Sequence, residues 1–373
     1  MIGYSSGQVI LVMFRNILKI CSTRRCFVAK NHFDKSRKLW CRKNYDVSNF
    51  EKLNKVVLSS RRLNDLFSRL TPQSKRNSGL WGTIMISGFF GLFKEKEEEK
   101  SESELIMTIK RAVLLIQRDD FKGAEQLLHL ALKLAQDQHN EDGVTYIYDL
   151  LANLAFAQGH FNTAEKLFVN VMQRLIQVGV SEDDLKINHI SLKLAKIYEE
   201  KKDDKKAEEG YKFCLKNLQG KVDVSLEDHD AVLLWAMSLD WYARFLLSKD
   251  RLDDALANFE KAYELSLKLH GEIHEQTVVL LNDLGTICYL KGDHDNALNY
   301  LTKAIEIGKH LPNMEDFSSV YVNLGNIYMQ QKMFDEAKKY CKEGWQNANR
   351  HKNNEGIQEA TLCLKELSKI MSS

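Results

Sequence analysis

The stretch LNDLGTICYLKGDHDNALNYLTKAIEI, residues 281–307, decides the fold. Its apolar residues recur with helical spacing on both sides of a short turn at residues 291–295. Gly285 in the first helix, and Ala297 and Ala304 in the second, are small enough to let two antiparallel helices approach closely. The stretch therefore predicts a helical hairpin with a tightly packed interior.

Copies of this hairpin recur along the chain from about residue 105. Each copy carries an alanine at the same place in its second helix, and successive alanines lie 40, 43, 48, 42 and 40 residues apart. These residues are Ala124, Ala164, Ala207, Ala255, Ala297 and Ala337. The recurrence of a small residue, a large one and an alanine resembles the tetratricopeptide repeat, whose basic period is about 34 residues. We therefore predict an all-α fold, a right-handed superhelical array of about six hairpins over residues 105–354, closed by a capping helix at 355–373.

The wide spacing of the alanines means that some helices or loops are longer than in the basic repeat. Residues 266–277, which contain HGEIHEQT, resemble the lengthened repeats of the kinesin light chain family. Residues 219–230, QGKVDVSLEDHD, are acidic and polar. We expect this second segment to form an exposed excursion between two hairpins.

The concave face of such an array is the expected binding surface. Polar side chains at inward-facing positions of the first helices can pair with the backbone of an extended or helical peptide, and Trp241 could supply an apolar anchor. The alternative is a polar face that is merely hydrated. The predicted partner-binding groove comprises Asp149, Asn153, Trp241, Arg244, Asn282, Asp283, Thr286, Asn323 and Asn326.

The sequence contains no P-loop, G-x-G-x-x-G or C-x-x-C motif. His270 and His274 are four residues apart but lack the H-E-x-x-H order and an evident third ligand, so a metal hydrolase is disfavoured. We expect no enzyme activity, no metal and no cofactor. The cysteines of the repeats are predicted to be small buried apolar residues without disulfide or redox roles: Cys214, Cys288, Cys341 and Cys363.

The net charge of +2 conceals two oppositely charged parts. Residues 1–78 carry 17 Lys/Arg and 4 Asp/Glu, a net charge of +13, whereas residues 79–373 carry 36 and 47, a net charge of −11. Asp34 is the first acidic residue, after a start rich in arginine, lysine and apolar residues. This pattern is typical of a mitochondrial transit peptide followed by a basic disordered region. A basic arm for nucleic acid is the alternative, but no basic patch interleaved with aromatic residues follows it, so we expect no nucleic-acid binding.

An uncharged apolar segment, GLWGTIMISGFFGLF at residues 79–93, precedes an acidic linker at 94–104. As a helix it would be ~22 Å long, against a hydrocarbon thickness of ~30 Å, which favours a short membrane anchor or an apolar docking hairpin over a core helix. Lys75 and Arg76 before it and acidic residues after it favour repeats in the intermembrane space, although the side is left open. The predicted membrane or docking residues are Leu80, Trp81, Ile84, Met85, Ile86, Phe89, Phe90, Leu92 and Phe93.

Four runs carry a more specific resemblance: TYIYDLLANLAF (145–156), ISLKLAKIY (190–198), GYKFCL (210–215) and SLDWYARFLL (238–247). They resemble the mitochondrial tetratricopeptide-repeat family associated with respiratory complex III. This resemblance implies a non-catalytic inner-membrane protein that assists assembly or maintenance of the cytochrome bc1 complex and clears fragments of its Rieske subunit. The implied partners are complex III subunits, including the Rieske protein. The alternative is a cytosolic kinesin-light-chain-like cargo or cell-division adaptor.

Overall fold

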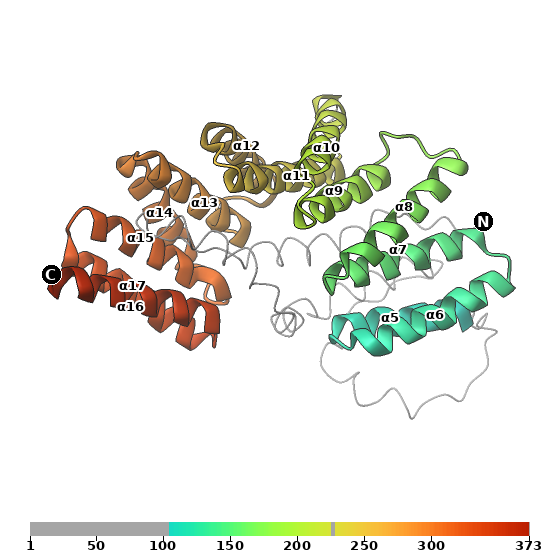
Figure 1. Ribbon diagram of the computed structural model, residues 1–373, viewed down its shortest axis with the longest axis horizontal. Helices are drawn as coiled ribbons and strands as arrows, with labels where there is room; N and C mark the ends of the chain where they lie inside the picture. The colour runs from blue at the N-terminus through green and yellow to red at the C-terminus, as the bar shows by residue number, and fades with distance from the viewer. Residues whose placement is uncertain (1–103, 225–227, 373) are drawn as a thin grey trace, which may run out of the picture. The chain divides into compact units, whose positions relative to one another are not determined.

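The structure is a computed structural model that describes residues 104–224 and 228–372 (Figure 1). Every regular element in these ranges is a helix, so the predicted all-α fold class is confirmed. The transit peptide predicted at 1–78 and the apolar segment predicted at 79–93 lie outside the described residues, as does all but the last residue of the acidic linker.

The described helices divide into two compact units. The first comprises α5 (Glu104–Gln117), α6 (Phe121–Asp137) and α7 (Glu141–Ala157), which pack in sequence order. The second begins with α8 (Phe161–Gln177) and continues with α9 (Leu185–Glu200), α10 (Asp204–Val224), α11 (His229–Ser248), α12 (Leu252–His270), α13 (Glu275–Lys291), α14 (His294–Gly308), the short 3-10 helix η3 (Glu315–Phe317), α15 (Ser318–Gln330), α16 (Phe334–Arg350) and α17 (Asn354–Ser372). In this unit the hairpins α9/α10, α11/α12, α13/α14 and α15/α16 follow one another, and the predicted capping helix is α17.

The repeat alanines lie in the packed interior. All six of them are fully buried. Gly285 has the same role from the facing helix, because a Cβ added there would lie 2.7 Å from Leu301 Cγ. Small residues on both sides thus allow α13 and α14 to pack closely, as residues 281–307 predict.

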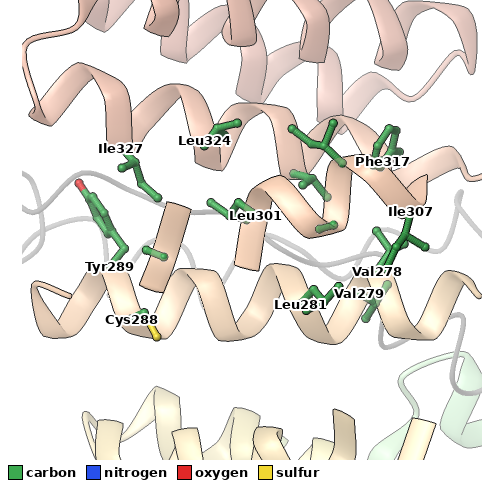
Figure 2. Close-up of a cluster of buried hydrophobic side chains, with 14 of the residues drawn as sticks. Val278, Val279, Leu281, Cys288, Tyr289, Leu301, Ile307, Phe317, Leu324 and Ile327 are labelled. Atoms are coloured by element: carbon green, nitrogen blue, oxygen red, sulfur yellow. The ribbon is translucent and has the colours of Figure 1, made fainter. Parts of the chain in front are cut away.

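The apolar core continues from one hairpin to the next (Figure 2). Val278 and Leu281 from α13, Leu301 from α14 and Leu324 and Ile327 from α15 belong to one buried cluster. Each buried apolar side chain of this size contributes about 1.5–3 kcal/mol relative to an exposed one. The stability of such an array therefore arises from contacts within hairpins and between neighbouring hairpins.

The turn that precedes each helix with a repeat alanine contains a residue in the left-handed backbone conformation, five positions before that alanine. Glycine occupies this position in two turns, at Gly159 and Gly292. The other turns use Asp119, Lys202, Asp250 and Lys332, with φ between 60° and 64°. A left-handed residue ends the first helix and lets the chain reverse before the second helix begins.

Two predictions about the repeats need correction. Residues 219–224 belong to the last turns of α10, and α11 begins at His229, so the segment predicted as an exposed excursion is partly helical and only 225–227 lie outside the described residues. The chain extends α10 because Val222 is a buried side chain one turn after the buried Leu218.

The second correction concerns the cysteines. All four cysteines of the repeats are buried, as predicted, but Cys341 of α16 and Cys363 of α17 form a disulfide, with their Cα atoms 6.0 Å apart. The expectation of no disulfide was wrong because residues 22 positions apart meet where α17 packs on α16. Cys214 and Cys288 are free thiols.

None of the helices among the described residues is both long and apolar enough to span a membrane.

Candidate binding face

The first helices of three successive hairpins, α11, α13 and α15, carry a row of polar side chains that are bonded to one another. We call this row the polar seam. It consists of Asp240 and Arg244 on α11, Asn282, Asp283 and Thr286 on α13, and Asn323 on α15. Apart from Asp240, all of these residues belong to the predicted groove.

Arg244 joins α11 to α13. Its Nη2 donates to Asp240 Oδ1 at 2.9 Å and to Asp283 Oδ2 at 2.6 Å. The guanidinium also lies 5.5 Å from the centre of the Phe259 ring. The Arg244 side chain is 20% exposed, whereas both carboxylates that it pairs with are buried.

Asn323 joins α13 to α15. Its Nδ2 donates to Asn282 Oδ1 at 2.9 Å and to Thr286 Oγ1 at 3.3 Å. Thr286 Oγ1 in turn donates to the Asn282 carbonyl oxygen at 2.8 Å. The two bonds of Asn323 link residues about forty positions apart, so they connect neighbouring repeats.

The remaining predicted groove residues of this unit lie beside the polar seam. Trp241 is 2% exposed, so its ring lies within the packed structure and is not presented as a surface anchor. Asn326, one turn after Asn323 on α15, is also buried. Whether any of these residues binds a partner stays a prediction.

Asp149 and Asn153 lie on α7, in the other compact unit. Asn153 Nδ2 donates to the Asp149 carbonyl oxygen at 2.7 Å, one turn earlier on the same helix. Both residues are therefore described by themselves, apart from the polar seam.

Asp240 is the seam residue that the sequence analysis missed. It precedes Arg244 by four positions, the separation at which an acidic and a basic side chain meet on one helix face. That i,i+4 spacing in SLDWYARF was the available signal.

His270 and His274 have a structural role. Their rings stack with centres 4.1 Å apart, and His274 Nδ1 accepts a hydrogen bond from the Gln276 backbone N–H at the start of α13. Burial, aided by His274 and His229, lowers the pKa of His270 to about 4, so the imidazole is neutral at pH 7. Across residues 104–224 and 228–372, no group of three His, Cys, Asp or Glu could hold a metal ion.

The free thiols are poorly suited to nucleophilic chemistry. Burial raises the pKa of Cys214 far above its usual value. Burial and then the Asp293 carboxylate raise the pKa of Cys288 to about 11. Both thiols are therefore protonated at neutral pH, whereas a nucleophilic cysteine must be a thiolate.

Comparison with known proteins places this geometry among helical repeats. Models of the tetratricopeptide repeat match residues 232–309 and 318–344. The solved structures of BtubC (BKLC) from P. vanneervenii and of the apo form of RapI share the fold. They align with TM-scores of 0.50 and 0.53 over 68% and 72% of this chain, and 94% and 87% of their own, at 22% and 14% identity.

Two curated relatives are more similar in sequence. The mitochondrial tetratricopeptide repeat protein 19 homolog of Drosophila melanogaster is 31% identical over 303 residues, which cover 81% of this chain and 82% of that protein. The mitochondrial tetratricopeptide repeat protein 19 of Homo sapiens is 35% identical over 292 residues, 76% of this chain and 77% of its own. Both alignments are long enough to include most of the repeat array.

Proposed function

Since this chain belongs to the family of mitochondrial tetratricopeptide repeat protein 19, we propose that it is a non-catalytic scaffold that holds subunits of respiratory complex III. In this role it assists assembly or maintenance of the complex and clears fragments of the Rieske subunit. The observation that carries the proposal is the likeness to mitochondrial relatives over about four-fifths of the chain. A helical-repeat array supports it, because such arrays act mainly as binding surfaces.

The chain's own residues support adhesion and not chemistry. The polar seam joins neighbouring hairpins through hydrogen bonds between buried side chains, and the free thiols are buried and protonated. The resemblance of residues 145–156, 190–198 and 238–247 to the complex III-associated family motivates the choice of partner.

The proposed location is the mitochondrial inner membrane, with residues 79–93 as anchor or docking hairpin and the repeats in the intermembrane space. The basic residues before this segment and the acidic residues after it support that orientation. The Cys341–Cys363 disulfide supports it independently, since disulfides are rare in compartments where thiol reductants dominate.

Loss of the chain from mitochondria is the test of the proposed function. We expect its deletion to lower the amount of fully assembled complex III, measured by native gel electrophoresis, and to cause Rieske fragments to accumulate. Re-expression of the full chain should restore both. Unchanged complex III and no fragments after deletion would contradict the proposal.

Fractionation tests the location separately. We expect the chain to remain with mitochondrial membranes after carbonate extraction and to become protease-sensitive in mitoplasts. Alkylation of intact mitochondria before and after reduction should show Cys341 and Cys363 protected until reductant is added. A cytosolic chain would favour the cargo or cell-division adaptor, and protease protection in mitoplasts would put the repeats in the matrix.

A further inference from the structure

The last helix, α17, exposes a face that is covered on the first helices of the two preceding hairpins. Gly285 on α13 packs against α14, since a Cβ at this glycine would lie 2.7 Å from Leu301 Cγ. Gly325 on α15 packs against α16, since a Cβ there would lie 2.7 Å from Cys341 Sγ. Forty residues after Gly325, the equivalent position on α17 is occupied by Lys365, which is exposed. The face of α17 at Lys365 is therefore the one on which α13 and α15 each carry the second helix of their hairpin.

The opposite face of α17 packs on α16 (Figure 1). Cys363 forms the disulfide with Cys341, and a Cβ at Gly356 would lie 2.9 Å from Ala348 Cβ. Away from this contact, exposed side chains recur three or four positions apart, as residues on one side of a helix do. We call the following residues the outer face of α17: the partly exposed Glu355 and the exposed Gln358, Leu362, Lys365 and Lys369.

The charges of the outer face are arranged symmetrically about Leu362, which is 57% exposed. Glu355 lies seven positions before Leu362, and Lys369 lies seven positions after it. Within residues 104–224 and 228–372, neither of these two charged side chains forms an ion pair. The outer face thus presents an exposed leucine midway between an acidic and a basic side chain.

This arrangement fits a second copy of α17 that runs in the opposite direction. With a two-fold axis at Leu362, the Leu362 side chains of the two copies meet, and Glu355 of each copy lies opposite Lys369 of the other. The remaining pairs across the axis are Gln358 with Glu366, and Glu359, which also interacts within its own chain, with Lys365. None of these pairs joins like charges. A partner of uniform charge would instead be repelled by one half of the outer face.

We propose that the outer face of α17 is a self-association surface, on which two copies of the chain pair through antiparallel α17 helices. The second copy's α17 occupies the side of the helix that faces a second helix in α13 and α15. This interaction goes beyond the proposed scaffold function and does not depend on which polypeptide the scaffold holds. Exposed ion pairs contribute little and each copy supplies one leucine to the axis, so we expect a dimer that dissociates on dilution.

Sedimentation velocity of the full-length chain in a neutral detergent tests the association. We expect the sedimenting mass to rise from one chain to two as the protein concentration increases. Added salt should shift the equilibrium back toward single chains, because it screens charges at a surface. A mass of one chain at every concentration up to about 100 μM would overturn the proposal.

Charge exchange tests the antiparallel pairing. Glu355→Lys and Lys369→Glu each place like charges in both ion pairs of the dimer, so each variant alone should associate roughly tenfold more weakly than the wild type. The double variant, Glu355→Lys with Lys369→Glu, should associate like the wild type. The two positions are about 21 Å apart along one helix, so such a rescue cannot arise within a single chain.

A mixture of the two single variants is the sharpest form of this test. Glu355→Lys in one copy then faces Lys369→Glu in the other, and every ion pair of the mixed dimer is attractive. With the helix content of each variant verified by circular dichroism, we expect the mixture to associate more strongly than either variant alone. A mixture that associates no better than its components would refute the pairing.

The contact on the axis is tested by Leu362→Lys, which places two lysines against each other. We expect a roughly tenfold or greater loss of association. Leu130→Lys on α6, at a side chain 48% exposed, is the matched control for the same change elsewhere and should associate like the wild type. Association of Leu362→Lys at wild-type strength, or an equal loss in Leu130→Lys, would show that the outer face of α17 is not the surface that joins the copies.

Discussion

Two groups of side chains on α13 are held in different ways. Gly285 packs against Leu301 in the same hairpin, in an apolar interior closed by Ala297. Asn282 and Asp283 are bonded to Asn323 and Arg244, which belong to the neighbouring hairpins. The interior is thus built within one repeat, whereas the polar seam exists only once several repeats are stacked. The apolar interior should therefore govern the stability of each hairpin, and the polar seam should govern how neighbouring repeats are joined.

The largest effect is expected from Leu301→Ala. Leu301 of α14 is fully buried in one cluster with residues of α13 and α15. Its truncation removes apolar contacts and leaves a cavity, which should lower the free energy of unfolding by about 2–5 kcal/mol. Urea denaturation measures the loss. Leu362→Ala, at a side chain 57% exposed, is the control and should change stability by less than ~0.5 kcal/mol. Equal losses would break the distinction between interior and surface.

Arg244→Met tests the polar seam. It removes the cation that pairs with the buried carboxylates of Asp240 and Asp283, which should lower the free energy of unfolding by roughly 3 kcal/mol, the low end for such pairs because Arg244 is partly exposed. Arg251 provides a matched control, since it also pairs with two carboxylates, Glu208 and Asp254, but at the surface. We expect Arg251→Met to cost at most ~1 kcal/mol. Urea denaturation measures both losses of stability. A larger loss for Arg251→Met than for Arg244→Met would contradict this prediction.

Ala255→Leu tests the repeat register from the interior side. Ala255 is fully buried, so the larger leucine side chain should overpack the interior of its hairpin. We expect the free energy of unfolding to fall by about 1–3 kcal/mol and the melting temperature to decrease. Ala257→Leu, two residues further along α12 and exposed, should have almost no effect. If both variants melt like the wild type, Ala255 is not the residue that sets the helix spacing.

The smallest effect is expected at the turns between the two helices of a hairpin. Lys332 has φ of 60° in the position that Gly292 occupies in the preceding hairpin. Lys332→Gly should remove the strain of a left-handed non-glycine residue but raise the backbone entropy of the unfolded chain. The net increase in the free energy of unfolding should therefore be below ~1 kcal/mol. The reciprocal change, Gly292→Lys, should lose about 1 kcal/mol. Differential scanning calorimetry resolves both, and a destabilised Lys332→Gly would show that this lysine has a further role.

The apolar interior of the hairpins could be predicted from the sequence. The spacing of Ala255, Ala297 and Ala337 reflects contacts inside single hairpins, and those contacts join residues close in the chain. Gly285 was recognised for the same reason, because its partner Leu301 lies sixteen positions away. Local periodicity contains the information that such packing requires.

The polar seam and the disulfide could be predicted from the sequence only in part. The inward-facing positions of Asn282 and Asn323 follow from helical periodicity, but their mutual bond depends on the relative rotation of α13 and α15. The Cys341–Cys363 pairing depends in the same way on how α17 lies against α16. The unpartnered N–H of Trp241 is a property of its surroundings and has no signal in residue type or spacing.

The Cys341–Cys363 bond also affects how the end of the array opens. A terminal helix has a neighbour on one side only and is ordinarily the first to fray. A covalent link that closes a loop of this length restricts the unfolded chain by about 3 kcal/mol. While the bond is intact, α17 cannot detach far from α16, so amide hydrogens of both helices should exchange together. Reduction of the disulfide would let α17 unfold without α16. The redox state of the surroundings would then determine how much of the C-terminal end of the array unfolds locally.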